Sequence, residues 1–179
     1  RAPQNIPATA TQPLPQIEGG PNAFFGGTDP ADNSGVLQYI RIEFAGVALT
    51  PNNEINGLTF GAVGNGTVVD HIQVSYSGDD SYEWFGGTVN CKYLVTFRGL
   101  DDEWDTDNGY SGKVQFGVAL RDPDIADVSG SNGFESDNDA NGTTNQPQTQ
   151  AVFANMSNFI APPTAGNTLA SDYKRGMHI

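Results

Sequence analysis

The chain has 179 residues, and its 21 acidic residues against 8 basic ones give a formal net charge of −13. This length suffices for one domain with its own core. The negative charge excludes nucleic acid and anionic membranes as partners and favours cations. No apolar run in the sequence approaches the roughly 20 residues of a transmembrane segment, and no signal peptide is visible.

The N-terminal part is poor in regular patterns. Residues 1–22 are rich in Pro, Thr and Gln, so we expect residues 1–33 to form an extended arm and an irregular segment. Residues 34–179 are predicted to form coils, with loop excursions at 140–150 and 161–168, where Asn, Gly, Pro and Thr gather. Because the chain begins at Arg1 and ends without a terminal signal, we expect a fragment of a longer chain.

Four segments alternate apolar and polar residues with the period of two that half-buried strands show. No stretch of 12 residues has the helical period of 3.6, so the sequence predicts an all-β fold. The residues predicted to face the core are Ile40, Ile42 and Phe44, then Ile72, Val74 and Tyr76, then Tyr93, Val95 and Phe97, and finally Val114, Phe116, Val118 and Leu120.

An acidic pair recurs along the chain, because Asp101-Asp102 follows Asp79-Asp80 after 22 residues. A period of roughly 20–25 residues with short strands is typical of a solenoid, whose coils bury their apolar faces by stacking. The leucine and asparagine template of leucine-rich repeats is absent. A β-sandwich would give similar strands but not this recurrence. We therefore predict a right-handed parallel β-helix, a solenoid with roughly 22 residues per coil.

Long stretches of the sequence resemble a known family. Residues 52–142, together with 16–20 (QIEGG), 26–46 and 173–179 (YKRGMHI), resemble secreted parallel β-helix proteins of Bacteroidetes-type bacteria. The resemblance implies the fold and a location outside the cell or on its outer surface. The family is largely uncharacterised, so the resemblance implies no activity and no catalytic residue.

Carboxylates are concentrated in the middle of the chain, where residues 70–139 hold 15 of the 21 acidic residues. If one coil is about 22 residues long, the two acidic pairs stack at one corner, with Glu83, Asp105 and Asp107 nearby. Stacked carboxylates repel one another, so a bound cation, a neighbouring arginine or full exposure to water must offset the repulsion. We predict Ca²⁺ as the cofactor of this corner, with Asp79, Asp80, Asp101 and Asp102 as ligands.

Residues 137–142 match the opening half of a calcium-binding loop, D-x-[DN]-x-[DN]-G, with Asp137, Asp139 and Asn141 as predicted ligands. Gln148 stands where a bidentate Glu would close the loop, so a helix-flanked calcium loop is excluded. The alternative for this segment and for the acidic pairs is a turn in which Asp and Asn side chains accept hydrogen bonds from their own backbone.

Two further kinds of site remain open. Asp80 and Asp102 on successive coils form a carboxylate pair of the type that glycosidases use, and Arg98 is a candidate base for a lyase. Three aromatic residues near the acidic pairs, Trp84, Trp104 and Tyr110, are either a surface on which sugar rings stack or core residues of the solenoid.

The sequence therefore favours a non-catalytic, calcium-stabilised β-helix protein that is secreted or on the cell surface. It would act as a scaffold or bind a glycan or a partner protein. One alternative is a polysaccharide lyase or glycoside hydrolase that uses the stacked carboxylates. Another is a subunit of a larger surface assembly.

Overall fold

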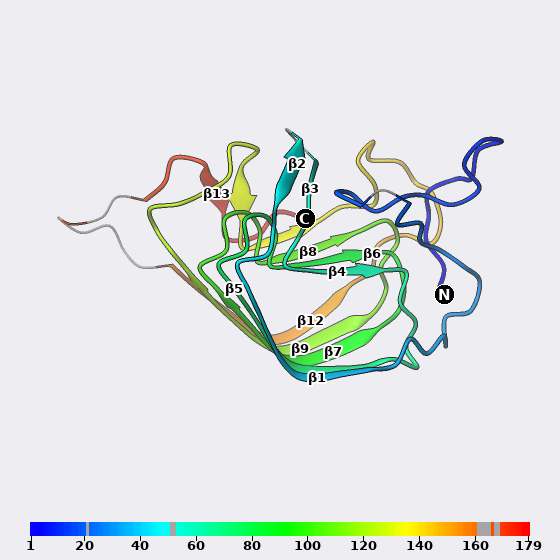
Figure 1. Ribbon diagram of the computed structural model, residues 1–179, viewed down its shortest axis with the longest axis horizontal. Helices are drawn as coiled ribbons and strands as arrows, with labels where there is room; N and C mark the ends of the chain where they lie inside the picture. Colours follow the sequence, from blue (N-terminus) through cyan, green and yellow to red (C-terminus); the bar gives the residue numbers. More distant parts are fainter. Residues whose placement is uncertain (21, 51–52, 161–165, 167–168) are drawn as a thin grey trace.

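The computed structural model describes residues 1–179 except 21, 51–52, 161–165 and 167–168. The described residues form thirteen strands and no helix (Figure 1). In this part of the chain there is consequently no helix that could span a membrane. The all-β class predicted from the sequence is confirmed.

Two parallel sheets make up most of the molecule, as Figure 1 shows. The five-stranded sheet, in spatial order, consists of β1 (Val36–Glu43), β5 (Val68–Ser75), β7 (Asn90–Phe97), β9 (Lys113–Arg121) and β12 (Val152–Ile160). The four-stranded sheet consists of β11 (Phe134–Ser136), β8 (Trp104–Asp107), β6 (Tyr82–Phe85) and β4 (Leu58–Gly61). Two small sheets pair β10 (Ser131–Asn132) with β13 (Tyr173–Arg175) in parallel and β2 (Ala48–Thr50) with β3 (Asn53–Glu54) antiparallel.

From β4 to β9 the chain alternates between the two large sheets, so each coil gives one strand to each sheet. Every strand pair in these two sheets is parallel. In the centre of the five-stranded sheet, Val68 pairs with Asn90 and Asn90 pairs with Lys113. At its two ends, Val36 pairs with Val68 and Lys113 pairs with Val152, and these partners are further apart in the sequence. The connections are therefore longer at both ends of the sheet than in its centre. This arrangement is a parallel β-helix.

The core lies between the sheets and contains aromatic rings that stack from coil to coil. Tyr82 and Trp104, register partners in β6 and β8, have ring centroids 5.3 Å apart. Trp84 stacks on Phe60 of β4 at 5.4 Å and on Tyr110 at 5.6 Å. Because register partners in adjacent strands lie about 4.8 Å apart, equivalent side chains superpose along the solenoid. All five rings are buried.

The strands of the five-stranded sheet bend in the middle, where one residue has a left-handed backbone conformation. The angle φ is +52° at His71, +57° at Tyr93 and +62° at Phe116. In β7 the bend turns two successive side chains outward, so that Cys91 before it and Leu94 after it are both buried. The strict alternation of a flat strand is therefore interrupted once in each of these strands.

The predicted inward faces of 92–98 and 114–120 are wrong beyond these bends. Val95 and Val118 point outward, and Thr96 and Ala119 are buried instead. Because apolar residues lie on both faces of these strands, the alternation pattern does not reveal this change of face. The exposed residues among those predicted to be buried are Phe44, Tyr76, Tyr93, Val95, Phe116, Val118 and Leu120, whereas Ile40, Ile42, Ile72, Val74 and Val114 are in or against the core.

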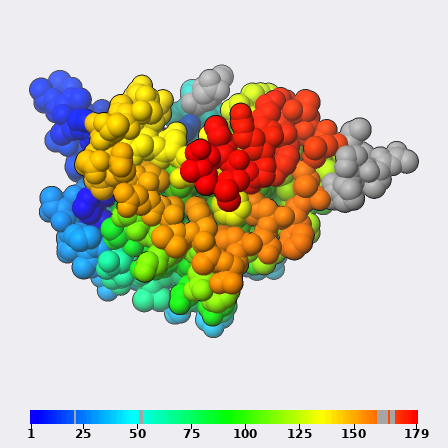
Figure 2. Space-filling model, turned by 180° about the vertical axis from the view of Figure 1, so that it is seen from behind, coloured from blue at the N-terminus to red at the C-terminus, as the bar shows by residue number. Residues whose placement is uncertain are grey.

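The described part of residues 1–33 contains no strand, but it is anchored to the coils. The backbone N–H of Ala2 donates to the carbonyl of Ala62 at 2.8 Å, and Phe25 packs in a second small core with Ala62 and Phe85. Residues 140–150 also contain no strand, and the loop expected at 161–168 lies, apart from Gly166, outside the described residues. Figure 2 shows β12 and the C-terminal residues over the face opposite to the view of Figure 1.

Candidate metal centre

Ten carboxylates line one cavity of about 380 Å³, which we call the acidic cavity. Of the described residues that line it, none is Lys or Arg. The lining carboxylates are those of Glu18, Glu54, Asp79, Asp80, Glu83, Asp101, Asp102, Asp105, Asp127 and Glu135. Asn56, Val128 and Ser129 complete the wall.

The four-stranded sheet contributes a row of three carboxylates to the cavity. Asp105 of β8 is the register partner of Glu83 in β6 and of Glu135 in β11. The side chains of successive residues in a strand point to opposite faces, and the neighbours Tyr82 and Trp104 face the core. The parallel register therefore places the three carboxylates one strand spacing apart on the face away from the core.

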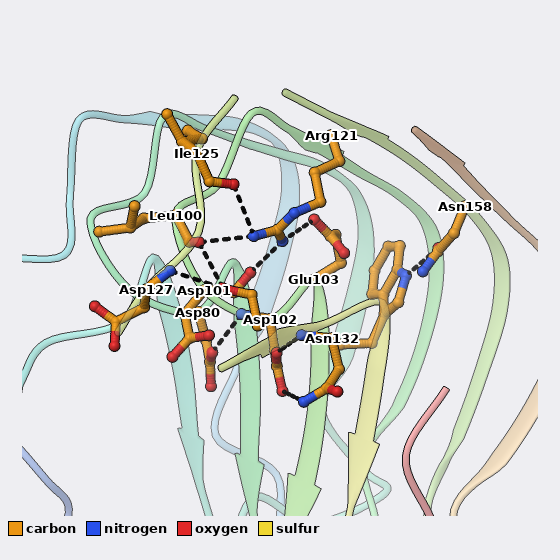
Figure 3. Close-up of polar contacts among 12 residues, drawn as sticks. Asp80, Leu100, Asp101, Asp102, Glu103, Arg121, Ile125, Asp127, Asn132 and Asn158 are labelled. Atoms are coloured by element: carbon orange, nitrogen blue, oxygen red, sulfur yellow. Dashed lines mark hydrogen bonds and ion pairs between the residues drawn. The ribbon is translucent and has the colours of Figure 1, made fainter. Parts of the chain in front are cut away.

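The two acidic pairs predicted to stack lie in successive turns that lead into this sheet. Asp79-Asp80 precede β6, and Asp101-Asp102 precede β8. The backbone N–H of Asp102 donates to Oδ1 of Asp80 at 2.9 Å, and Asn132 donates to the carboxylate of Asp102 from its backbone N–H and from Nδ2 (Figure 3). Asp80 thus caps the turn at Asp102, and Asp102 caps the turn at Asn132, which fixes both carboxylates beside the cavity.

Burial and mutual repulsion raise the pKa values of the carboxyls in the acidic cavity. Burial, followed by the charges of neighbouring carboxylates, raises the pKa of Asp79 to about 7 and that of Asp105 to about 8. The pKa of Asp102 rises to about 10, and those of Asp80 and Glu83 also lie well above their usual range, again mainly because of burial. At an effective dielectric constant of about 20, two like charges ~5 Å apart repel by roughly 3 kcal/mol. Protons or a cation must therefore compensate this charge.

Two groups of three carboxylates in the cavity have the geometry of a cation site. One contains Asp79, Asp80 and Asp101, and the other contains Asp80, Glu83 and Asp105; within each group one oxygen per residue lies within 4.8 Å of the others. Calcium–oxygen distances are about 2.3–2.6 Å, so oxygens on opposite sides of one ion are about 4.6–5.2 Å apart. Oδ1 of Asp101 is buried and accepts no hydrogen bond from the described residues. The first group therefore fits Ca²⁺.

A different buried carboxylate next to the cavity has its own cation. Glu103 Oε1 accepts a hydrogen bond from Arg121 Nη1 at 2.8 Å, and both side chains are 2% exposed. The guanidinium also donates to the carbonyl oxygens of Leu100 and Asp101 (Figure 3). It stacks on the ring of Tyr173 at 4.6 Å. Arg121 thus pairs with Glu103 and does not line the acidic cavity.

The predicted calcium loop lies apart from the acidic cavity. The carboxylate of Asp139 accepts hydrogen bonds from the backbone N–H groups of Asn141 and Thr143, at 3.0 and 3.2 Å, and from the Thr143 hydroxyl. These donors hold the pKa of Asp139 below its usual value. Asp137 follows β11, with its backbone N–H bonded to the carbonyl of Thr106. The structure thus supplies Asp139 with protein partners, as in the alternative turn.

The remaining candidates are placed elsewhere. Of the two alternatives for Trp84, Trp104 and Tyr110, the structure supports core residues, because all three rings are fully buried. Their positions on the inward face of the four-stranded sheet and of the turn after it leave them no access to a ligand. Arg98 does not line the acidic cavity and instead pairs with Asp122, to which its Nε donates at 2.9 Å. The structure therefore brings Asp80 and Asp102 together, but it places the candidate base Arg98 elsewhere.

Several lining residues were not recognised from the sequence. Glu18 comes from the N-terminal segment, and Glu54 and Asn56 come from the hairpin strand β3 and the residues after it. Asp127 and Glu135 belong to the longer connection after β9 and to β11. Glu18, Glu54, Asp127 and Glu135 do not repeat at about 22 positions. Asn56 occupies the place of Asp80 in the preceding coil, because Leu58 pairs with Tyr82, but it carries an amide instead of a carboxylate. The acidic residues at 134–139 are the one sequence feature near these positions. They predict a calcium loop at 137–142 and not a site that includes Glu135.

Comparison with protein families agrees with this architecture. The family model of the pectate-lyase-like beta helix domain matches residues 1–179. The chain therefore belongs to the pectate-lyase-like beta helix domain family. No curated protein and no solved structure matched the chain.

Proposed function

We propose that this chain is part of a secreted or cell-surface, non-catalytic β-helix protein whose acidic cavity binds calcium and thereby stabilises the stacked coils. The observation that carries the proposal is the set of ten cavity carboxylates without a lysine or arginine among the described lining residues. The resemblance of residues 52–142 to secreted proteins supports the location. A right-handed coil is supported by the strong preference of parallel crossovers for that hand.

The chemistry of the cavity suits calcium better than a softer metal. The three residues of the first group offer only carboxylate oxygens, and neither histidine of the chain lines the cavity. Calcium accepts six to eight oxygen ligands in flexible geometry, with water completing the set. An ion here would link Asp79 and Asp80 of one coil with Asp101 of the next, so its binding energy would be added to the pairing of the coils.

Thermal unfolding with millimolar calcium, compared with excess chelator, tests the proposal. A site filled at 100 times its dissociation constant stabilises the folded state by about 2.7 kcal/mol, which is visible as a higher midpoint. Asp101→Asn should reduce this gain, because it removes a carboxylate of the first group. Asp172→Asn is the matched control, because Asp172 pairs with Lys174 on the surface and lies outside the cavity. An equal midpoint in calcium and chelator would contradict the proposal.

The enzymatic alternative receives less support from the geometry. Asp80 and Asp102 are adjacent, but both are almost fully buried and accept hydrogen bonds from backbone N–H groups of the next coil. Arg98, the candidate base, is bonded to Asp122 instead. Incubation with acidic polysaccharides should therefore release neither reducing nor unsaturated ends.

A second candidate function is glycan binding on the outer face of the five-stranded sheet. At the strand bends, Tyr39, His71, Tyr93 and Phe116 stack in one row with centroid separations of 4.6, 4.6 and 5.1 Å. Their row borders a surface groove of about 650 Å³ that also presents Gln73 and other polar side chains. Aromatic rings with a few polar groups are the usual lining of small-molecule sites.

Binding of a panel of oligosaccharides, measured by calorimetry, tests this second function. Tyr93→Ala should reduce the affinity at least tenfold, because it removes a central ring of the row. Phe159→Ala is the control, since Phe159 is an exposed aromatic residue of β12 outside the groove. Equal affinities for the two variants, or no binding to the original chain, would exclude the groove as a glycan site.

A further inference from the structure

The two carboxylate groups in the acidic cavity share one residue. The loop group consists of Asp79, Asp80 and Asp101, and the strand group consists of Asp80, Glu83 and Asp105. We propose that the acidic cavity binds two calcium ions that share Asp80, and that the second ion is held by the strand group together with the side-chain oxygen of Asn56. This inference rests on the proposed calcium function and extends it to residues that the sequence did not identify as ligands.

Asn56 provides evidence that is independent of the carboxylates. Its side chain lines the acidic cavity, the residue is 4% exposed, and its Oδ1 is buried without a partner among the described residues. Its Nδ2 donates to Oε2 of Glu83. With a cation bound, the Glu83 carboxylate is ionised and only accepts hydrogen bonds, so this contact sets the orientation of the amide and leaves Oδ1 free to contact the ion. Buried polar atoms normally have a partner, and an amide oxygen is a calcium ligand.

The backbone holds Asn56 beside the shared aspartate. The N–H of Gly57, the next residue, donates to the carbonyl oxygen of Asp80 at 2.7 Å. Glu83 lies three residues after Asp80, and Asp105 is the register partner of Glu83 on the adjacent strand. All four proposed ligands are thus attached to paired strands or to the turns that enter them. A site built on such rigid elements needs little rearrangement to accept an ion.

Charge favours two ions over one. The two groups together contain five carboxylates, and the described residues lining the cavity include no lysine or arginine. One divalent ion at the loop group would leave Glu83 and Asp105 facing each other across one strand spacing without compensation. A second ion would neutralise most of the charge that remains on these five carboxylates. Three carboxylates and one amide oxygen leave room for the water molecules that complete a calcium shell.

Counting the bound ions tests the inference. Equilibrium dialysis and calorimetry with calcium should give two ions for the 179-residue chain. Asp79→Asn, which alters only the loop group, and Glu83→Gln, which alters only the strand group, should each leave one. Asn56→Ala should weaken one of the two binding steps at least tenfold and leave the other unchanged. Asp172→Asn, outside the cavity, should still bind two ions.

The outcomes separate this inference from the proposed function. One bound ion whose affinity is unchanged in Asn56→Ala and Glu83→Gln would overturn the second site and leave the calcium function standing. No bound ion would overturn both. Where Glu83→Gln fails to fold, judged by circular dichroism, Asn56→Asp replaces it. This variant keeps an oxygen at the same place and adds a negative charge, so one binding step should become at least threefold tighter; an unchanged step would overturn the second site.

Discussion

Two sets of buried carboxylates lie side by side at the entrance of the four-stranded sheet, and they are compensated differently. Glu103 faces Arg121 across a buried ion pair of 2.8 Å, and this partner counteracts part of the effect of burial on its pKa, which is about 7. Asp105 faces other carboxylates, which add to the effect of burial and raise its pKa to about 8. The chain supplies a cation for the first set and leaves the second to take protons or an ion from solution.

The largest expected effect comes from removing the internal cation. Arg121→Met should destabilise the fold by about 3–5 kcal/mol, because it removes the partner of a buried carboxylate and leaves Glu103 without its ion pair. Calcium should not restore this loss, since Glu103 does not line the acidic cavity. Chemical denaturation with and without calcium measures both effects. Arg98→Met is the control: Arg98 pairs with Asp122 at the surface, and such pairs contribute at most about 1 kcal/mol. Similar losses for the two variants would contradict the distinction.

Removing a charge from the uncompensated set should have the opposite sign. In excess chelator at pH 8.5, Asp105→Asn should stabilise the fold by an amount on the order of 1–3 kcal/mol, because the amide needs no counter-charge. The same variant should lose much of the gain from calcium. Denaturation curves in chelator and in calcium give both values. A variant that is less stable than the original chain in chelator would show that the hydrogen bond from the backbone of Thr106 outweighs the repulsion at Asp105.

The uncompensated set also determines how stability depends on pH. In the folded state the pKa values of Asp79 and Asp105 are about 7 and about 8, both raised from 3.8. Between pH 3.8 and these raised pKa values, the folded state binds more protons than the unfolded state. The stability of the fold therefore decreases as pH rises through this interval. In chelator, the thermal midpoint should therefore fall between pH 5 and pH 8. Saturating calcium should reduce this fall, because it replaces the protons. A midpoint in chelator that rises with pH would contradict the charge arrangement.

Much of this site follows from local sequence patterns. The recurrence of Asp79-Asp80 as Asp101-Asp102 predicted that the two pairs meet, and the structure joins them through the hydrogen bond between Asp102 and Asp80. The strands themselves follow from the alternation of apolar residues, and their parallel stacking follows from the recurrence. These features depend on neighbours within one coil or between adjacent coils, which a period in the sequence reveals.

Other features depend on contacts that no period reveals. Glu18 and Glu54 reach the cavity from the N-terminal segment and from the hairpin region between β1 and β4, outside the recurring pattern. Asn56 has the place of Asp80 in its own coil, but its amide does not mark it as part of the acidic pattern. Tyr93 points outward because its own backbone conformation is left-handed. An aromatic side chain does not predict such a conformation. Whether Trp84 lies inside or outside depends on which face of β6 meets the second sheet, and alternation alone gives no answer.

A third kind of carboxylate sharpens the comparison, because it needs neither an arginine nor an ion. Asp139 accepts hydrogen bonds from the backbone of Asn141 and Thr143 and is bonded to the Thr143 hydroxyl. Asp139→Ala should therefore cost only about 1 kcal/mol, the usual loss for a side chain that caps a turn. The midpoint gain from calcium should be the same as in the original chain.

Calcium titrations of Asp139→Ala followed by thermal unfolding decide between the two interpretations of residues 137–142. If calcium stabilises this variant less than it stabilises the original chain, the loop is itself a calcium site and the turn hydrogen bonds are replaced when the ion binds. If calcium stabilises Asp139→Ala as much as the original chain, and stabilises Asp101→Asn less, calcium acts at the acidic cavity alone. Backbone N–H donors, a buried guanidinium and a bound cation would then be three separate ways in which one acidic chain keeps its carboxylates charged.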